Sequence, residues 1–246
     1  MFRTFCALLT TLILTVSIQA QENSQPIRGG LRIGDYSASI GVQLGNNWVS
    51  NPSDDRGYIS MNHLQVYEIR LGSSFYGLSD AKIEIDGKEV GVFRIKSNQA
   101  VVIERNVKDR GRFTFLRNGT QEYFNAGLDR VSSANRGLIK VVFYPQRINY
   151  RNIEPNNLPH ETGLPSSFDL KSGGTGLSGM SNQDFQDAIN IERDYSKTTT
   201  IYLRLIEATR YQTSEPSNEI RPLEDVNNYG RVTVPKNNPV PPPVER

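Results

Sequence analysis

The chain has 246 residues, of which 28 are lysine or arginine and 26 are aspartate or glutamate, so its formal net charge is +2 at pH 7. Because it contains no basic or acidic block, binding to nucleic acid, anionic membrane or mineral through bulk charge is not supported. The one cysteine, Cys6, lies near the N-terminus, and the remainder of the chain can form no disulfide. We therefore expect the fold to depend on a packed core of ordinary size.

The first twenty residues have the composition of a secretory signal peptide. Arg3 gives a short basic region, and residues 5–18 are apolar or hydroxylic. The small residue Ala20 precedes the polar Gln21, which predicts cleavage between them. We expect a protein secreted to the extracellular space or, for a bacterial source, to the periplasm or cell surface. The alternative, an uncleaved anchor, needs about twenty apolar residues to cross a bilayer, and this run is shorter.

Alternation of apolar and polar residues predicts β-strands through most of the chain. The predicted strands cover 36–44, 66–71, 83–85, 90–95, 100–104, 113–115, 137–144 and 198–206. Asp86-Gly87 and Asn118-Gly119 favour the positive φ of tight hairpin turns, and residues 45–55 indicate a loop. The strand at 137–144 is the most apolar, so we expect it in the centre of a sheet.

Many short strands without a strong helix predict an all-β protein, a single antiparallel β-sandwich or barrel-like domain of about seven or eight strands with flexible polar tails. We expect a signal peptide over 1–20, a polar extension over 21–32, the sandwich over 33–210 and a largely disordered, proline-rich tail over 211–246. Within a long polar connection, only residues 184–191 favour a short helix.

Gly174-Thr175-Gly176-Leu177-Ser178-Gly179 matches the glycine spacing of dinucleotide-binding loops. That spacing works only between a strand and a helix whose N-terminus faces the pyrophosphate. Because no strand precedes this motif and only weak helical character follows it, we predict a flexible glycine-rich loop over Gly173–Gly179, whose role stays open. No cofactor is expected.

Histidine is scarce, with His63 and His160 alone. A zinc site needs three or four converging histidine, cysteine or carboxylate ligands, and no twelve-residue calcium loop is present. No nucleophile elbow flanked by glycines supports serine hydrolase chemistry. We therefore predict no metal site and no catalytic residues, and we expect each histidine on the surface or in a loop.

Carboxylates are the remaining candidates for chemistry. Glu84 and Asp86 are expected on one side of a strand, Asp54-Asp55 lie in a loop, and Glu104 ends another strand. Two acids on a strand face could serve glycoside hydrolysis or bind calcium, but either function needs partners from elsewhere in the fold. The alternative is a solvated strand face beside a turn, which is the usual place for acidic residues.

Asn118-Gly119-Thr120 is the only sequon for N-glycosylation, since Pro52 blocks the one at Asn51. The same three residues also explain a turn without any sugar. Both interpretations of Asn118 stay open.

A pattern of sequence extends across several strands: Tyr67–Leu71, Ala81–Ile95, Ile103–Arg105, Arg112–Phe115, Gly173-Gly174-Thr175 and Thr200–Leu205. This pattern resembles an uncharacterised family of β-rich proteins and domains found in large DNA viruses and various other organisms. The resemblance implies one compact β domain and makes the glycine loop a family feature. The family has no established catalytic residues, so none is carried over, and a signal peptide is not expected of a viral member.

Together these features favour a secreted, non-catalytic structural or binding protein, such as a component of an extracellular, shell or skeletal matrix. Its expected partners are matrix, a surface polymer or another protein, with no nucleic acid and no membrane span. Self-association through exposed edge strands is a further expectation. The alternatives are a secreted enzyme that acts on polysaccharide through Glu84, Asp86 or Glu104, and a secreted toxin.

Overall fold

The computed structural model describes residues 24–148, 159–166, 172–208, 220–226 and 231–236. The predicted signal peptide, its cleavage between Ala20 and Gln21, and the end of the proline-rich tail lie outside the described residues. No helix among the residues described is long and apolar enough to cross a membrane.

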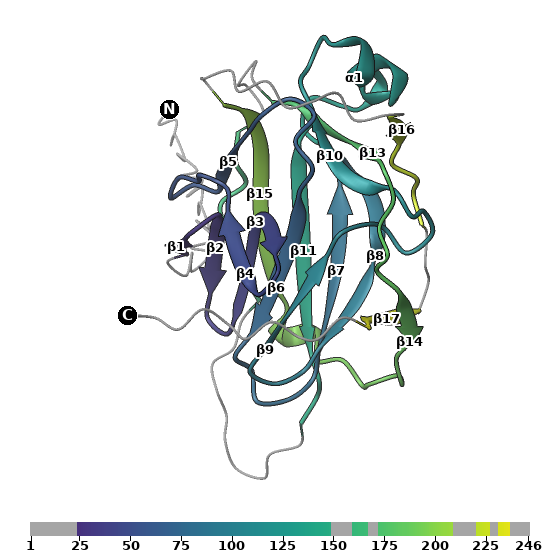
Figure 1. The fold of residues 1–246 in the computed structure, drawn as a ribbon. Helices are drawn as coiled ribbons and strands as arrows, with labels where there is room; N and C mark the ends of the chain where they lie inside the picture. Colours follow the sequence, from purple (N-terminus) through teal and green to yellow (C-terminus); the bar gives the residue numbers. More distant parts are fainter. Residues whose placement is uncertain (1–23, 149–158, 167–171, 209–219, 227–230, 237–246) are drawn as a thin grey trace, which may run out of the picture.

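Two large β-sheets face each other as a sandwich, which confirms the predicted all-β fold (Figure 1). The first sheet is antiparallel throughout, and its β4 (Asn47–Ser50) pairs with β3, so the predicted loop at 45–55 contains a strand. The other strands, in spatial order, are β1 (Gln25–Ile27), β2 (Gly30–Ile33), β3 (Tyr36–Leu44), β6 (Glu68–Ser73) and β9 (Gln99–Ile103).

The second sheet has eight strands and contains the most apolar strand, β11, in its interior, as predicted. Its spatial order is β12 (His160–Glu161), β15 (Thr199–Glu207), β11 (Leu138–Pro145), β7 (Ser79–Ile85), β8 (Lys88–Ile95), β17 (Val232–Pro235) and β14 (Phe185–Asp187), while β5 (Tyr58–Met61) also pairs with β15. The pairs β12–β15, β5–β15 and β17–β8 are parallel. These short parallel pairs were not expected from the sequence.

A third, small sheet lies beside one end of the sandwich and consists of β10 (Arg112–Leu116), β13 (Gly174–Ser178) and β16 (Arg221–Pro222). Parts of the predicted polar extension and tail therefore form strands, because β1, β2, β16 and β17 pair with the sandwich or with this sheet.

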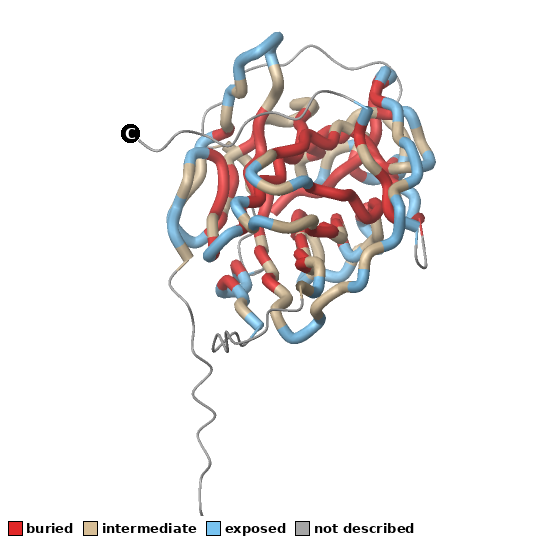
Figure 2. Tube along the Cα trace, turned by 90° about the horizontal axis from the view of Figure 1, so that it is seen from below, coloured by how far each residue is buried: buried red, intermediate tan, exposed pale blue. Residues whose placement is uncertain are grey.

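The core lies between the two large sheets, where buried residues concentrate in the end-on view (Figure 2). The apolar members of each alternating strand point inward, for example Ile69 of β6 and Val141 of β11, both fully buried. Tyr36 of β3 stacks on Phe143 of β11 with ring centroids 4.7 Å apart. Aromatic contact thus joins the two sheets across the core.

The turn at Asn118-Gly119 does not join two strands, contrary to prediction. It leads into helix α1 (Gln121–Asn125), which is followed by the 3₁₀ helix η1 (Leu128–Arg130). The hydroxyl of Thr120 accepts the backbone N–H of Tyr123 at 3.3 Å and so caps the helix. Tyr123 is buried, which anchors the helix to the domain.

The predicted helix over 184–191 is also wrong, because Phe185–Asp187 forms β14 and pairs with β17. The remaining short helix, η2, covers Tyr195–Lys197. Pairing with a segment about fifty residues away in sequence decides the conformation of β14, and local propensity cannot anticipate it.

Residues Gly174–Ser178 of the glycine motif form strand β13 and are buried, whereas Gly179 is exposed, which corrects the prediction of a flexible loop over Gly173–Gly179. A Cβ on Gly173 would overlap the ring of Phe115 and lie 2.5 Å from the carbonyl oxygen of Leu116. Glycine is needed here because β13 packs directly on β10. The motif is therefore a close-packed strand and not a phosphate-binding turn.

Candidate functional site

A groove of about 300 Å³ lies on the outer face of the eight-stranded sheet. Strands β7, β11 and β15 provide its floor, and the segments before β11 and after β12 contribute its walls. The residues that line it are Glu84, Gly87, Asn135, Leu138, Lys140, Leu164 and Tyr202. We call it the Tyr202 groove.

The floor consists of three neighbouring side chains. Lys140 of β11 pairs in register with Glu84 on one side and with Tyr202 on the other. The carboxylate of Glu84 lies 3.5 Å from the ammonium of Lys140 and 3.0 Å from that of Lys82, which also contacts Glu89 at 3.0 Å. The charges on the floor are therefore paired within the protein.

The phenol of Tyr202 stays protonated at neutral pH. Burial, a hydrogen bond with Glu161 and the negative charge of Glu84 all raise the pKa of Tyr202 well above its usual value. The side chain is half-buried and lines the groove. Tyr202 thus contributes an aromatic ring to the groove, while its hydroxyl is hydrogen-bonded to Glu161.

Arg204, two residues further along β15, fixes both walls. Its side chain is 1% exposed, and its guanidinium donates to the carbonyl oxygens of Ala134 at 2.9 Å, of Arg136, and of Pro165 at 3.0 Å. Burial lowers the pKa of Arg204, but a guanidinium remains charged in proteins. One side chain therefore holds the segments on either side of the groove against the sheet.

Asp86 does not share the exposed face with Glu84, contrary to prediction. The pairing of β7 with β8 shifts register between Ile83 and Glu84, and Asp86 has a positive φ of 53°. Its buried carboxylate accepts the backbone N–H groups of Gly137 at 2.6 Å and Thr175 at 2.7 Å. It supports the groove from below by holding the start of β11.

Burial raises the pKa of Asp86 to about 7, although the hydrogen bonds from Thr175 and Gly137 and the charges of Lys88 and Arg204 act in the opposite direction. Desolvation thus outweighs four favourable interactions. Both oxygens of this carboxyl group accept hydrogen bonds from backbone N–H groups, so the side chain has a structural role.

Glu104 lies on the other sheet, just after β9, where it accepts a hydrogen bond from the hydroxyl of Ser181 at 2.8 Å. The three acids considered for glycoside hydrolysis are therefore in three different surroundings: Glu84 in the groove, Asp86 buried beneath it, and Glu104 outside it. The structure does not bring them together.

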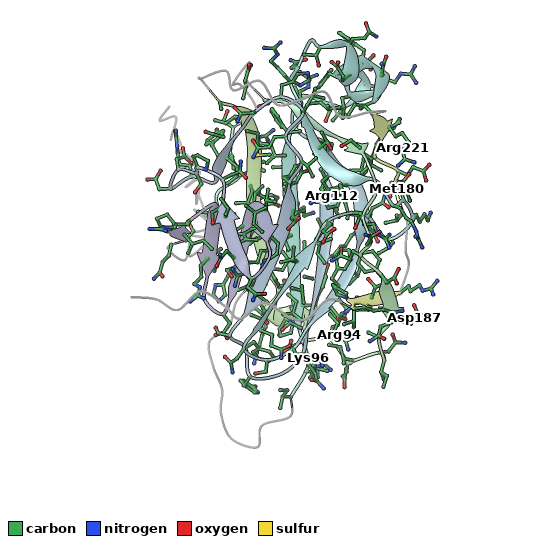
Figure 3. All side chains as sticks on the ribbon, viewed as in Figure 1. Arg94, Lys96, Arg112, Met180, Asp187 and Arg221 are labelled. Atoms are coloured by element: carbon green, nitrogen blue, oxygen red, sulfur yellow. The ribbon has the colours of Figure 1, made fainter. Side chains whose placement is uncertain are left out.

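A further carboxylate, Glu68 of β6, was not among the predicted candidates, because it alternates with the apolar Tyr67 and Ile69 as a solvent-facing strand residue does. Its side chain is only 2% exposed, and burial raises its pKa. It accepts the backbone N–H of Gln43 at 2.8 Å and a guanidinium N–H of Arg112 at 2.7 Å; Arg112 lies near the middle of the molecule in Figure 3. Both carboxylate oxygens have partners within the protein.

The two histidines lie in different elements. The Nδ1 atom of His63, in a loop, accepts the backbone N–H of Arg117 at 3.2 Å, and its Nε2 atom is 3.4 Å from Glu122 of α1. His160 belongs to β12. Among the residues that the structure describes, no group of three or more histidine, cysteine or carboxylate side chains could hold a metal ion.

The other predicted residues have simple surroundings. Asp54 accepts backbone N–H groups of Arg56 and Tyr58 within its own turn. Asn118 is exposed beside the cap of α1, and its glycosylation stays a prediction. The groove itself was not predicted, because Asn135 and Leu164 reach it from irregular segments whose positions depend on the contacts of Arg204.

Comparison with known proteins gives no match: no protein-family model, curated protein or solved structure matches the chain. The resemblance to β-rich domains of large DNA viruses therefore stays a prediction. The function is inferred from the groove and its surroundings.

Proposed function

We propose that the protein is a secreted, non-catalytic binding protein that attaches to a polymer of an extracellular or cell-surface matrix through the Tyr202 groove. The composition of residues 1–20 supports secretion.

The observation that carries this proposal is the fixed shape of the groove. Arg204 holds both walls by hydrogen bonds to three backbone carbonyl groups, so binding does not have to order the site first. A volume of about 300 Å³ is at the lower end of the usual range for ligand sites. Its mixture of one tyrosine ring, two leucines and a few polar groups is typical of such sites.

The state of the acids favours binding over catalysis. Glycoside hydrolysis uses two carboxyl groups on either side of one bond. Glu84 is instead held between Lys82 and Lys140, and Asp86 is bonded to two backbone N–H groups. Each acid therefore already has partners within the protein, and the two do not flank a common space.

The proposal is tested with the chain that begins at Gln21, incubated with insoluble cellulose, chitin and β-1,3-glucan and then sedimented. We expect the wild-type protein to sediment with at least one polymer and Tyr202→Ala to bind it roughly tenfold more weakly, since a central aromatic side chain contributes about 1–3 kcal/mol to binding. Phe124→Ala is the matched control, because Phe124 is an exposed aromatic residue on α1, outside the groove.

Thermal unfolding of each variant establishes that it is folded. Equal sedimentation of wild type and Tyr202→Ala would contradict the role of the groove. Release of soluble sugar from any polymer would favour the enzyme instead, and leakage of dye from liposomes would favour the toxin.

A further inference from the structure

The Tyr202 groove continues along the outer face of β11. Lys140, Val142 and Tyr144 are half-exposed and alternate with fully buried residues, so they form a row down this strand. From Lys140 to Tyr144 the distance is about 13 Å at the usual rise of a strand. The row begins at Lys140, in the groove, and ends at Tyr144, four residues further along β11.

A second aromatic residue stands at the far end of this row. Tyr195, in η2, is 63% exposed, and its ring meets that of Tyr144 edge to face with centroids 5.7 Å apart. Tyr202 lies beside Lys140 at the opposite end. Two tyrosine rings are thus available at the two ends of one strand.

The charges on this face are paired within the protein. Lys82 contacts Glu84 and Glu89. At the far end, Asp80 is 1% exposed and binds both Arg94 and Arg193, the latter at 2.9 Å; Arg94 is labelled at the lower end of Figure 3. A charged ligand would have to compete with these pairs, whereas an uncharged one would not.

The position of the row argues against a peptide partner. Extended peptides usually add to the free edge of a sheet, where backbone groups are unpaired. Here β11 is paired with β7 and β15 on both sides, so only side chains are available. The hydroxyl groups of a sugar both donate and accept hydrogen bonds, which suits the mixed polar groups of the row. The C–H faces of sugar rings can also pack on tyrosine.

We infer that the ligand is a linear, uncharged polysaccharide that lies along β11 and contacts Tyr202 at one end and Tyr195 at the other. This inference rests on the proposed function and extends it to the class and length of the ligand. The groove alone would hold only a short part of such a polysaccharide.

Calorimetric titration of cellohexaose and chitohexaose, with the corresponding disaccharides, tests the length of the site. We expect a hexasaccharide to bind about tenfold more tightly than its disaccharide. Tyr195→Ala weakens hexasaccharide binding about tenfold and leaves disaccharide binding unchanged, because the disaccharide occupies only the groove. Tyr202→Ala weakens both, and Phe124→Ala weakens neither.

The possible results separate the two proposals. The extended site is overturned if the wild type binds a hexasaccharide and its disaccharide with equal affinity. It is also overturned if Tyr195→Ala binds the hexasaccharide as tightly as the wild type does. Either result leaves the groove itself in place. Tighter binding of hyaluronan than of either hexasaccharide overturns the uncharged class. Failure of both hexasaccharides to bind a protein that sediments with cellulose or chitin overturns the single linear chain along β11. Failure of the wild type to bind any polymer overturns the proposed function itself.

Discussion

At the scale of single residues, Asp86 connects three segments that are distant in sequence. It directly follows β7, accepts a hydrogen bond from Gly137 before β11, and accepts another from Thr175 of β13. Thr175 in turn shares a hydrogen bond of 2.7 Å with the hydroxyl of Tyr67. This buried polar cluster joins the small sheet to both large sheets.

The stability of the fold is expected to depend on the ionisation of Asp86. In the unfolded chain an aspartate ionises near pH 4, whereas in the fold the pKa of Asp86 is about 7. Between these values the native state holds a proton that the unfolded state has released. The contribution of this group to the free energy of unfolding therefore decreases as pH rises from about 4 to 7.

Asp86→Asn tests this dependence, because an amide does not ionise. The variant places an NH₂ group against one backbone donor, so we expect it to be less stable than wild type at pH 4 by about 1–3 kcal/mol. From pH 4 to pH 8, the free energy of unfolding of the wild type should fall relative to that of the variant by on the order of a few kcal/mol. Urea denaturation across this range measures it, and parallel pH profiles would contradict the expectation.

At the scale of elements, β13 shows how glycine allows two strands and a helix to approach closely. Gly173 lies against Phe115 and Leu116 of β10, and Gly174 faces the side chain of Leu128. Phe115 and Leu116 are fully buried, so the neighbours of Gly173 have little space into which to move. Because these glycines have no side chains, β13 can lie close to β10 and to Leu128 of η1.

Substitution along this motif should therefore have graded effects. Gly173→Ala meets a buried ring and a backbone oxygen and is expected to lower the free energy of unfolding by about 3 kcal/mol or more. Gly179→Ala is the matched control, because nothing lies within 4 Å of the added Cβ, and it should cost about 1–2 kcal/mol for the left-handed φ of 58°. Chemical denaturation compares them, and equal losses would contradict close packing at Gly173.

Alternation of residues predicted the strands whose two faces differ. All eight predicted strands are present, and the β3 range, Tyr36–Leu44, agrees exactly in its bounds with the prediction. The pattern failed for β13, because glycine and serine carry no apolar signal, and for β14 and β17, which depend on each other. It also could not reveal the groove, because Arg204 and Asp86 act on backbone groups more than thirty residues away.

At the scale of the whole molecule, the free edge of β9 is covered by a side chain. The amide of Gln183 donates to the carbonyl oxygen of Val102 at 2.7 Å and accepts the backbone N–H of Glu104 at 3.0 Å. The guanidinium of Arg105 donates to the backbone oxygen of Gln183 at 2.9 Å and so holds it in place. The side-chain amide takes the position of a neighbouring strand, which is one way to prevent pairing between molecules.

Gln183→Ala is expected to expose this edge and to promote self-association. Sedimentation velocity over a range of concentrations should show a dimer that the wild type does not form under the same conditions. Gln186→Ala, at an exposed position on β14, is the control and should behave as wild type. A folded Gln183→Ala variant with the wild-type sedimentation coefficient would show that this edge is not an association site.

The anchoring of the groove by Arg204 has a consequence for the medium in which the protein works. Its three partners are carbonyl oxygens, which neither gain nor lose a proton in ordinary solution and carry no net charge that dissolved ions could screen. A guanidinium likewise keeps its charge at high pH. These three hydrogen bonds should therefore depend little on salt or on pH, whereas the support that Asp86 gives beneath the groove changes as its carboxyl group ionises.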